Sequence, residues 1–174
     1  MEEIEVKILE IDRPQVEKRL TALGATLSFD GEMAALFFDY ADQRISTAGS
    51  VLRLRKEGPR SVLTHKRPRP TQGAKVMHEL ETEVGSFDAT REILQATGLE
   101  VIKSTRKFRT QYDLPEGHVV IDDYQDDLAA IPVFVEIESP NLTDLQTLVL
   151  RLGFSLEDTN TWNTYDLVQH YIKG

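Results

Sequence analysis

Hydrophobic and polar residues alternate with a period of two over eight short stretches of the chain, a pattern typical of β-strands with two different faces. These stretches are residues 3–10, 35–40, 51–57, 61–66, 77–84, 104–113, 118–124 and 133–139. Helix start and stop signals predict four helices, at residues 12–23, 88–97, 143–152 and about 162–172. Many short strands and few helices favour an α+β chain built on an antiparallel sheet that curls or closes.

The charged residues of these strands recur at every second position, so each strand has one charged face. Glu3, Glu5 and Lys7 alternate with apolar residues in the first stretch, and Arg53 and Arg55 do so in the third. Such faces arise if one side of the sheet is in water, or if a barrel of about eight strands encloses a charged ligand. Periodicity alone leaves both alternatives open.

The distribution of charge indicates what such a ligand could be. The 174 residues have a formal net charge of −9, which argues against general nucleic-acid binding. Between residues 44 and 75, however, nine side chains are basic and only Glu57 is acidic, and a second basic stretch contains Lys103, Arg106, Lys107 and Arg109. Clustered cations in an acidic chain predict a small polyanion as ligand, with acidic residues available for a metal; a solvated charged hairpin is the alternative.

Several classes of protein are excluded by composition. The chain has no cysteine, so a disulfide framework, a thiolate zinc site and a cysteine nucleophile are ruled out. No apolar run approaches the roughly 18 residues of a membrane span. The length suits one domain over residues 1–174. We therefore expect a cytoplasmic single-domain protein without a membrane or nucleic-acid partner, and leave open whether it forms a homodimer.

An ordered series of motifs makes the prediction more specific. Residues 3–7 are Glu3-Ile4-Glu5-Val6-Lys7, an ExExK sequence. The motifs that follow are Phe37-Phe38-Asp39-Tyr40, Gly49-Ser50-Val51-Leu52-Arg53-Leu54-Arg55, Leu63-Thr64-His65-Lys66, His78-Glu79-Leu80-Glu81, Lys107-Phe108-Arg109-Thr110-Gln111-Tyr112, Val120-Ile121-Asp122-Asp123-Tyr124, Phe134-Val135-Glu136-Ile137-Glu138 and Thr164-Tyr165. In this order they resemble the CYTH-domain family, the triphosphate tunnel metalloenzymes, which includes class IV adenylyl cyclases, thiamine triphosphatases and inorganic tripolyphosphatases.

The resemblance implies a fold and a set of roles. The fold would be a closed eight-stranded antiparallel β-barrel, the triphosphate tunnel, with flanking helices. Catalytic residues would be Lys7, Glu5 and Glu138. Substrate-binding residues would be Arg53, Arg55, Lys66, Lys107, Arg109, Glu79 and Glu81. Ligands of Mg²⁺ or Mn²⁺ would be Glu3, Glu5, Asp122, Glu136 and Glu138, with the choice between Asp122 and Asp123 left open.

The chemistry of these residue types agrees with a triphosphate substrate. Guanidinium groups bind paired phosphate oxygens, and carboxylates are the ligands that Mg²⁺ and Mn²⁺ prefer. Two reactions fit: water attacks the terminal phosphorus, or the ribose 3′ hydroxyl of ATP attacks the α-phosphorus and pyrophosphate leaves. Because no adenine pocket is recognisable in the sequence, we rank triphosphate hydrolysis first and a class IV adenylyl cyclase second. A non-enzymatic polyphosphate or nucleotide binder is the third hypothesis.

Overall fold

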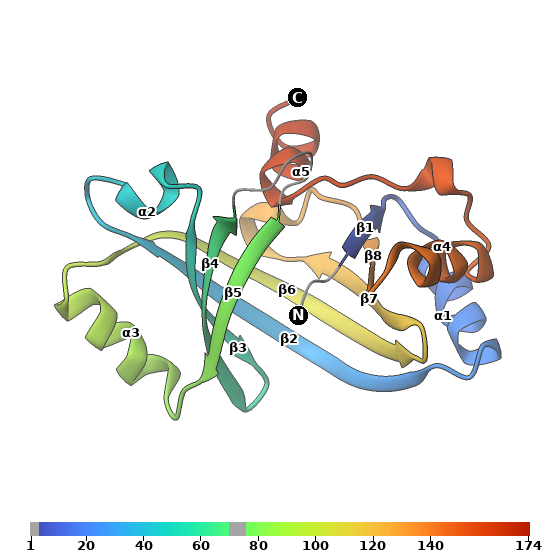
Figure 1. Ribbon diagram of the computed structural model, residues 1–174, viewed down its shortest axis with the longest axis horizontal. Helices are drawn as coiled ribbons and strands as arrows, with labels where there is room; N and C mark the ends of the chain where they lie inside the picture. Colours follow the sequence, from blue (N-terminus) through green and yellow to red (C-terminus); the bar gives the residue numbers. More distant parts are fainter. Residues whose placement is uncertain (1–3, 70–75) are drawn as a thin grey trace. The chain divides into compact units, whose positions relative to one another are not determined.

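The computed structural model describes residues 4–69 and 76–174 (Figure 1). The chain divides into two compact units. Unit 1 consists of Met1–Gly31 and Lys107–Gly174, and unit 2 consists of Glu32–Arg106. Glu3, one of the predicted metal ligands, lies outside the described residues.

The described residues contain all eight predicted strands. Their bounds are β1 (Ile4–Ile8), β2 (Thr26–Asp39), β3 (Val51–Glu57), β4 (Arg60–Arg69), β5 (Val76–Glu83), β6 (Glu100–Leu114), β7 (Gly117–Tyr124) and β8 (Phe134–Ser139). The strands form an eight-stranded antiparallel sheet in the order β1-β8-β7-β6-β2-β3-β4-β5. This confirms the α+β class and the antiparallel sheet with flanking helices. Because the hydrogen-bonded order starts at β1 and ends at β5, the predicted closure into a barrel is not confirmed.

Three strands are longer than the alternation predicted, and one of them, β4, ends at Arg69 instead of residue 66. β2 begins at Thr26 instead of residue 35, and β6 begins at Glu100 instead of residue 104. Asp30 and Gly31 are poor strand formers and interrupt the pattern, so the first half of β2 was missed. β2 and β6 each contain residues of unit 1 and of unit 2.

The four predicted helices are present, with ends shifted by one or two residues. They are α1 (Arg13–Ala22), α3 (Phe87–Ala96), α4 (Leu142–Arg151) and α5 (Thr164–Tyr171), and a short α2 (Arg44–Thr47) was not predicted. Each of the four longer helices begins after a residue whose side chain accepts a backbone N–H of the first turn; these caps are Asp12, Ser86, Asn141 and Asn163. In the described parts of the chain, no helix has the length and apolar character needed to cross a membrane.

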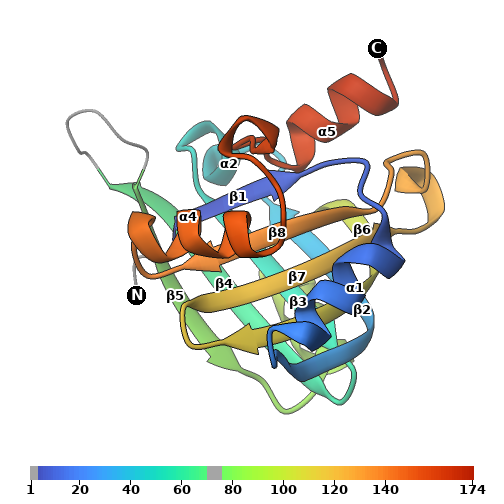
Figure 2. The same ribbon diagram turned by 90° about the vertical axis from the view of Figure 1, so that its right-hand side faces the viewer.

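The core of unit 1 lies between the sheet and two helices. Figure 2 shows α1 and α4 on the same face of β7 and β8. Leu20 of α1 and Leu148 of α4 are fully buried against Val119, Ile121 and other apolar residues of the strands. Because successive side chains of a strand point to opposite faces, this core takes one face of β7 and β8 and leaves their charged residues on the other.

The core of unit 2 is built on the same principle. Phe38 of β2 and Leu54 of β3 pack with Leu99, and the side chains of Phe87 and Leu94 from α3 cover them. Arg53 and Arg55, the residues next to Leu54 in the sequence, therefore lie on the opposite face of β3.

Asp39, at the end of β2, holds the start of the short helix α2. Its carboxylate accepts the backbone N–H groups of Tyr40, Ile45 and Ser46 at 2.8, 3.0 and 2.9 Å, respectively. Burial alone would raise the pKa of Asp39, but these hydrogen bonds outweigh it and lower the pKa to about 2. Asp39, the acidic residue of the Phe37-Phe38-Asp39-Tyr40 motif, therefore has a structural role within unit 2.

The lowered pKa of Asp39 predicts an acid-dependent loss of stability. A carboxyl group whose pKa is lower in the folded state stabilises the protein above the unfolded pKa near 4, and this contribution is lost as the pH falls toward 2. We expect the melting temperature of Asp39→Asn to change less between pH 5 and pH 2 than that of the wild type. Asp42→Asn, which changes an exposed carboxylate in the same loop, is the matched control. Equal pH profiles for Asp39→Asn and the wild type would contradict this role.

Candidate functional site

The strand register gathers the charged residues of unit 1 on one face of its sheet. Glu5 lies opposite Glu138, and Lys7 lies opposite Glu136, on the paired strands β1 and β8. Residues directly opposite each other in an antiparallel pair have side chains on the same face. This face is the one that α1 and α4 leave uncovered, because the intervening residues Val135 and Ile137 belong to the core.

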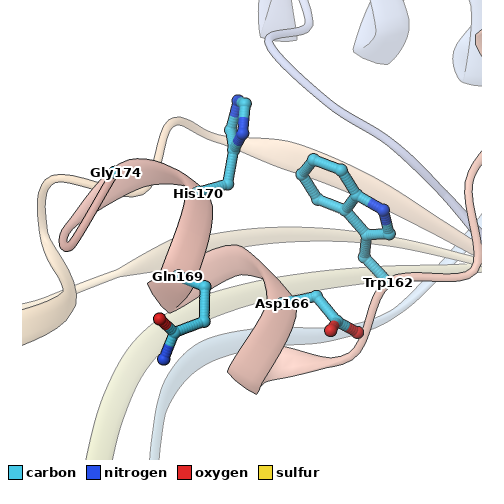
Figure 3. Close-up of a pocket in the computed structure, with 5 residues that line it drawn as sticks. All are labelled: Trp162, Asp166, Gln169, His170 and Gly174. Atoms are coloured by element: carbon cyan, nitrogen blue, oxygen red, sulfur yellow. The ribbon is translucent and has the colours of Figure 1, made fainter.

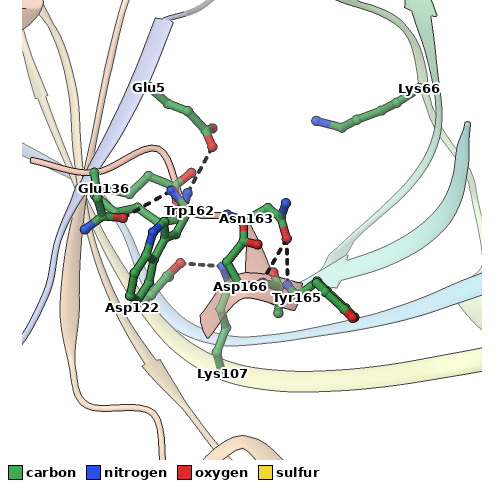
Figure 4. Close-up of polar contacts among 12 residues, drawn as sticks. Glu5, Lys66, Lys107, Asp122, Glu136, Trp162, Asn163, Tyr165 and Asp166 are labelled. Carbon is green, nitrogen blue, oxygen red and sulfur yellow. Dashed lines mark hydrogen bonds and ion pairs between the residues drawn. The ribbon is translucent and has the colours of Figure 1, made fainter. Parts of the chain in front are cut away.

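Asp122 of β7 is at the centre of a buried ion network. Its two carboxylate oxygens accept hydrogen bonds from Arg109 Nε at 2.7 Å and from Arg109 Nη2 at 2.6 Å. Lys107 Nζ donates to the same carboxylate (Figure 4). Asp122 has no exposed surface, and although burial opposes its ionisation, Lys107 and Arg109 lower its pKa. Two cations are therefore held in fixed positions by one carboxylate.

The two cations of this network respond differently to burial. Burial, together with the repulsion between its charge and that of Arg109, lowers the pKa of Lys107. The attraction of Lys107 to Asp122 offsets only part of this. For Arg109 burial is the largest single effect and would lower the pKa, but the hydrogen bonds to Asp122 and the charges of Asp122, Glu136 and Glu138 together outweigh it and raise the pKa. Arg109 also approaches the next carboxylate of the site, with Nη2 at 3.8 Å from Glu136 Oε2.

Lys7 is a buried lysine between two carboxylates. It is only 6% exposed, and its Nζ lies 2.9 Å from Glu5 Oε1 and 3.7 Å from Glu136 Oε2. Burial alone would lower the pKa of Lys7, but the charges of Glu136 and Glu5 outweigh it and raise the pKa. Lys7 is therefore a fixed positive charge at neutral pH.

Three carboxylates beside Lys7 form a group that suits a divalent cation. Glu5, Glu136 and Glu138 each offer an oxygen within 4.8 Å of the others. The pKa of Glu136 is raised, first by burial and then by the charges of Glu5 and Asp122, although Lys7 partly offsets this. A bound divalent cation would relieve this repulsion, and all three ligands are of the type that Mg²⁺ and Mn²⁺ prefer. The donor set fits such a metal.

The same geometry separates Asp122 from Asp123. Asp122 lies on the charged face with Arg109, its opposite residue on β6, while the next residue, Asp123, lies opposite Phe108 on the other face. The oxygens of Asp122 accept hydrogen bonds from Lys107 and Arg109, and Asp122 is not part of the three-carboxylate group. On this face of unit 1, Lys7, Asp122 and Glu136 are buried, whereas Glu5 is exposed.

Unit 2 contains the remaining predicted substrate-binding residues. Lys66 of β4 lies opposite Glu79 of β5 and forms an ion pair with it. Arg55 Nε lies 2.5 Å from Glu57 Oε1, and Arg55 Nη2 lies 3.8 Å from Glu81 Oε2. The predicted acidic residues of β5 thus neutralise the cations beside them.

Arg53 lies on the same face of β3 as Arg55. It is opposite Phe37 of β2 and Thr64 of β4. Thr64 is fully buried and donates its hydroxyl to Glu81 Oε2 at 2.9 Å. The register therefore brings together all the cations of unit 2 that the sequence analysis assigned to substrate binding.

Two features near these residues were not predicted. Lys103 of β6 contacts the ring of Phe37. Lys103 lies an even number of residues from Lys107 and Arg109 and so on the same face of the strand, and this spacing is the sequence signal that could have indicated its position. Asn160 exchanges two backbone hydrogen bonds with Lys7, of 2.8 and 2.9 Å, and so fixes the segment before α5 beside β1. No alternation in the sequence indicated this contact.

A pocket of 410 Å³ lies on α5 and the residue stretch before it (Figure 3). It is lined by Trp162, Asp166, Gln169, His170 and Gly174. None of these residues is a lysine or an arginine, so the pocket lacks the cations that a triphosphate group needs. It contains none of the predicted site residues.

Comparison with known proteins identifies the family. The model of the CYTH domain matches residues 1–151. A candidate adenylate cyclase of Methanocaldococcus jannaschii is 25% identical over 138 residues, which cover 79% of this chain and 77% of the relative. A candidate adenylate cyclase of Vibrio parahaemolyticus has a similar fold, with a TM-score of 0.78, 18% identity and coverage of 97% and 98% of the two chains. A candidate adenylyl cyclase from Hippeastrum, described as having a dominant triphosphatase activity, has a TM-score of 0.70, 17% identity and coverage of 98% and 96%. The chain belongs to the CYTH family.

Proposed function

We propose that this chain is a metal-dependent triphosphatase that hydrolyses inorganic tripolyphosphate or an organic triphosphate. CYTH proteins include enzymes that act on triphosphates. The observation that carries the proposal is the arrangement in unit 1, where the carboxylates of Glu5, Glu136 and Glu138 adjoin the buried cation Lys7. Carboxylates for a divalent cation beside fixed positive charges for phosphate oxygens are the requirements of phosphoryl transfer to water.

The acidic group would hold the metal. Glu5, Glu136 and Glu138 are the proposed ligands of Mg²⁺ or Mn²⁺, and Glu3 remains a predicted ligand. When bound, such a cation neutralises negative charge on phosphate oxygens and lowers the pKa of water. For Asp122 we propose a different role from the predicted one, because its oxygens already accept hydrogen bonds from Lys107 and Arg109. It would fix these two cations for phosphate binding.

The cations of the proposed site have different roles in substrate binding. Lys7 remains protonated beside Glu5 and would act as a fixed positive charge rather than as a base. Lys107 and Arg109 in unit 1, and Arg53, Arg55 and Lys66 in unit 2, are the proposed ligands of phosphate oxygens. Glu79 and Glu81 would act indirectly, since they pair with Lys66 and Arg55 in the absence of substrate and a phosphate would replace them.

An adenylyl cyclase is the second candidate. The names of the relatives from Methanocaldococcus jannaschii and Vibrio parahaemolyticus favour it. In that reaction the ribose 3′ hydroxyl of ATP attacks the α-phosphorus, and pyrophosphate leaves. The same cations and carboxylates would serve it, so the products have to distinguish the two reactions.

The reaction is tested by incubating the protein with Mg²⁺ or Mn²⁺ and either tripolyphosphate or ATP, and then separating the products. We expect orthophosphate to be released from tripolyphosphate, and more slowly from ATP. The reason is that every side chain assigned to substrate binding would contact a phosphate group or the metal, and none would contact a base. Cyclic AMP and pyrophosphate from ATP, with tripolyphosphate untouched, would favour the cyclase. Tight binding of both compounds without turnover would leave a binding protein.

Other parts of the hypothesis stay predictions. These are closure of the barrel, a single domain over residues 1–174, a cytoplasmic location and a homodimer.

A further inference from the structure

Lys103 of β6 lies on the charged face of unit 2, although neither the motifs nor the family resemblance assigned it a role. Its Nζ is 5.6 Å from the centre of the Phe37 ring. Phe37 lies opposite Arg53 in the register of β2 and β3, so its side chain shares a face with that of Arg53. The contact with Phe37 therefore places Lys103 on the same face as Arg53.

The surroundings of Lys103 differ from those of the other site lysines. Lys7 is paired with Glu5, Lys66 with Glu79, and Lys107 with Asp122. For Lys103, by contrast, no carboxylate lies within ion-pair distance in the described part of the chain. Burial lowers its pKa, and no neighbouring charge opposes this effect. A half-buried ammonium group without a counter-ion is unfavourable, and the ring of Phe37 compensates only part of the lost hydration.

The strand order brings a second cation into reach. β6, β2 and β3 are neighbours in the sheet, with Lys103, Phe37 and Arg53 on one face of these three strands. Neighbouring strands are about 4.8 Å apart, so β6 and β3 are separated by roughly twice that distance. The long side chains of Lys103 and Arg53 can span this gap over the aromatic ring and hold one tetrahedral oxyanion between them.

We propose that Lys103 and Arg53 form a phosphate-binding subsite over Phe37 and that Lys103 is a further substrate-binding residue of this chain. The ligand is a phosphate group of a polyphosphate or an organic triphosphate. The proposal rests on the proposed function for the identity of the substrate, but it concerns binding rather than hydrolysis. Because Lys103 has no carboxylate partner, a phosphate that binds there is attracted by the full charge of the ammonium group. At Lys66, by contrast, a phosphate first has to displace Glu79.

The test compares Lys103→Met with Lys56→Met. Methionine keeps the apolar stem that packs on Phe37 and removes only the charge. Lys56 is exposed on the same sheet, and its neighbours in sequence, Arg55 and Glu57, lie on the charged face, so Lys56 itself points away from that face. Tripolyphosphate affinity is measured by calorimetry without metal, at low and at physiological salt, and orthophosphate release is measured separately with Mg²⁺.

We expect Lys103→Met to weaken tripolyphosphate binding about tenfold and to reduce its salt dependence, since one charge-assisted contact is lost. Its melting temperature without ligand should equal or exceed that of the wild type, because an unpaired buried charge has been removed. Lys103→Arg should restore most of the affinity. Equal affinities for Lys103→Met and Lys56→Met would overturn the subsite. That outcome is distinct from a failure of the proposed function, which would appear as absence of orthophosphate release by the wild type.

Discussion

Asp122→Ala is expected to lower the free energy of unfolding by about 3–5 kcal/mol, the usual cost of removing one partner from a buried ion pair. The carboxylate is fully buried and accepts three hydrogen bonds from Lys107 and Arg109. Without it, these two cations remain in the interior, and the more distant carboxylate of Glu136 offsets their mutual repulsion less than Asp122 does. Urea unfolding of the variant and the wild type, with a comparison of midpoints and slopes, measures the difference.

The neighbouring residue provides a matched control for this experiment. Asp123 is only partly buried and lies on the other face of β7, opposite Phe108. Asp123→Ala should therefore cost less than about 1 kcal/mol, as is usual for a surface substitution. Similar losses in the two variants would show that the buried ion network does not govern the stability of unit 1.

Glu136→Gln is expected to separate stability from function. Because burial and the charges of Glu5 and Asp122 raise the pKa of Glu136, its ionised form is unfavourable in the metal-free protein. A neutral amide of the same shape should leave the metal-free melting temperature unchanged or raise it. The increase in melting temperature on adding Mg²⁺ or Mn²⁺ should shrink, and metal-dependent turnover should fall by about 100-fold or more, since one charged ligand is lost.

The controls for Glu136→Gln address charge and position. Glu83→Gln removes an exposed carboxylate that pairs with Arg60, and it should change neither metal binding nor turnover. Glu138→Gln should lower turnover in the same way as Glu136→Gln, because Glu138 belongs to the same group of three. Full metal-dependent activity in both of these site variants would refute the assignment of the metal ligands.

The pH dependence of the metal-free protein follows from the same carboxylate. A group whose pKa is raised by folding binds more protons in the folded state, so the protein loses stability as the pH rises through the pKa of that group. Asp122 acts in the opposite direction, because its pKa is lowered and its contribution is lost as the pH falls. Glu136→Gln should abolish only the first of these effects.

The sequence by itself determined the strands, the longer helices and the pairing of charged positions within each strand. Period-two alternation is a local property, so all eight strands were located, and capping residues and glycine stops located α1, α3, α4 and α5. Alternation also determined which residues share a face of one strand, such as Glu5 with Lys7 and Arg53 with Arg55. It could not show whether that face is in water, because burial depends on what other elements cover.

The tertiary structure decided the partners across strands, which depend on register and not on local sequence. Register places Lys7 opposite Glu136, and Asp122 rather than Asp123 beside Arg109. A shift of one residue would move every charged side chain to the core face, so packing of α1 and α4 against the apolar face fixes the arrangement. The sequence placed Lys103 in a basic stretch, but only the structure showed its contact with Phe37. The local pattern specified which side chains share a face of one strand. The burial of the apolar faces against the helices fixed the register, and the register decided which side chains lie opposite each other across strands.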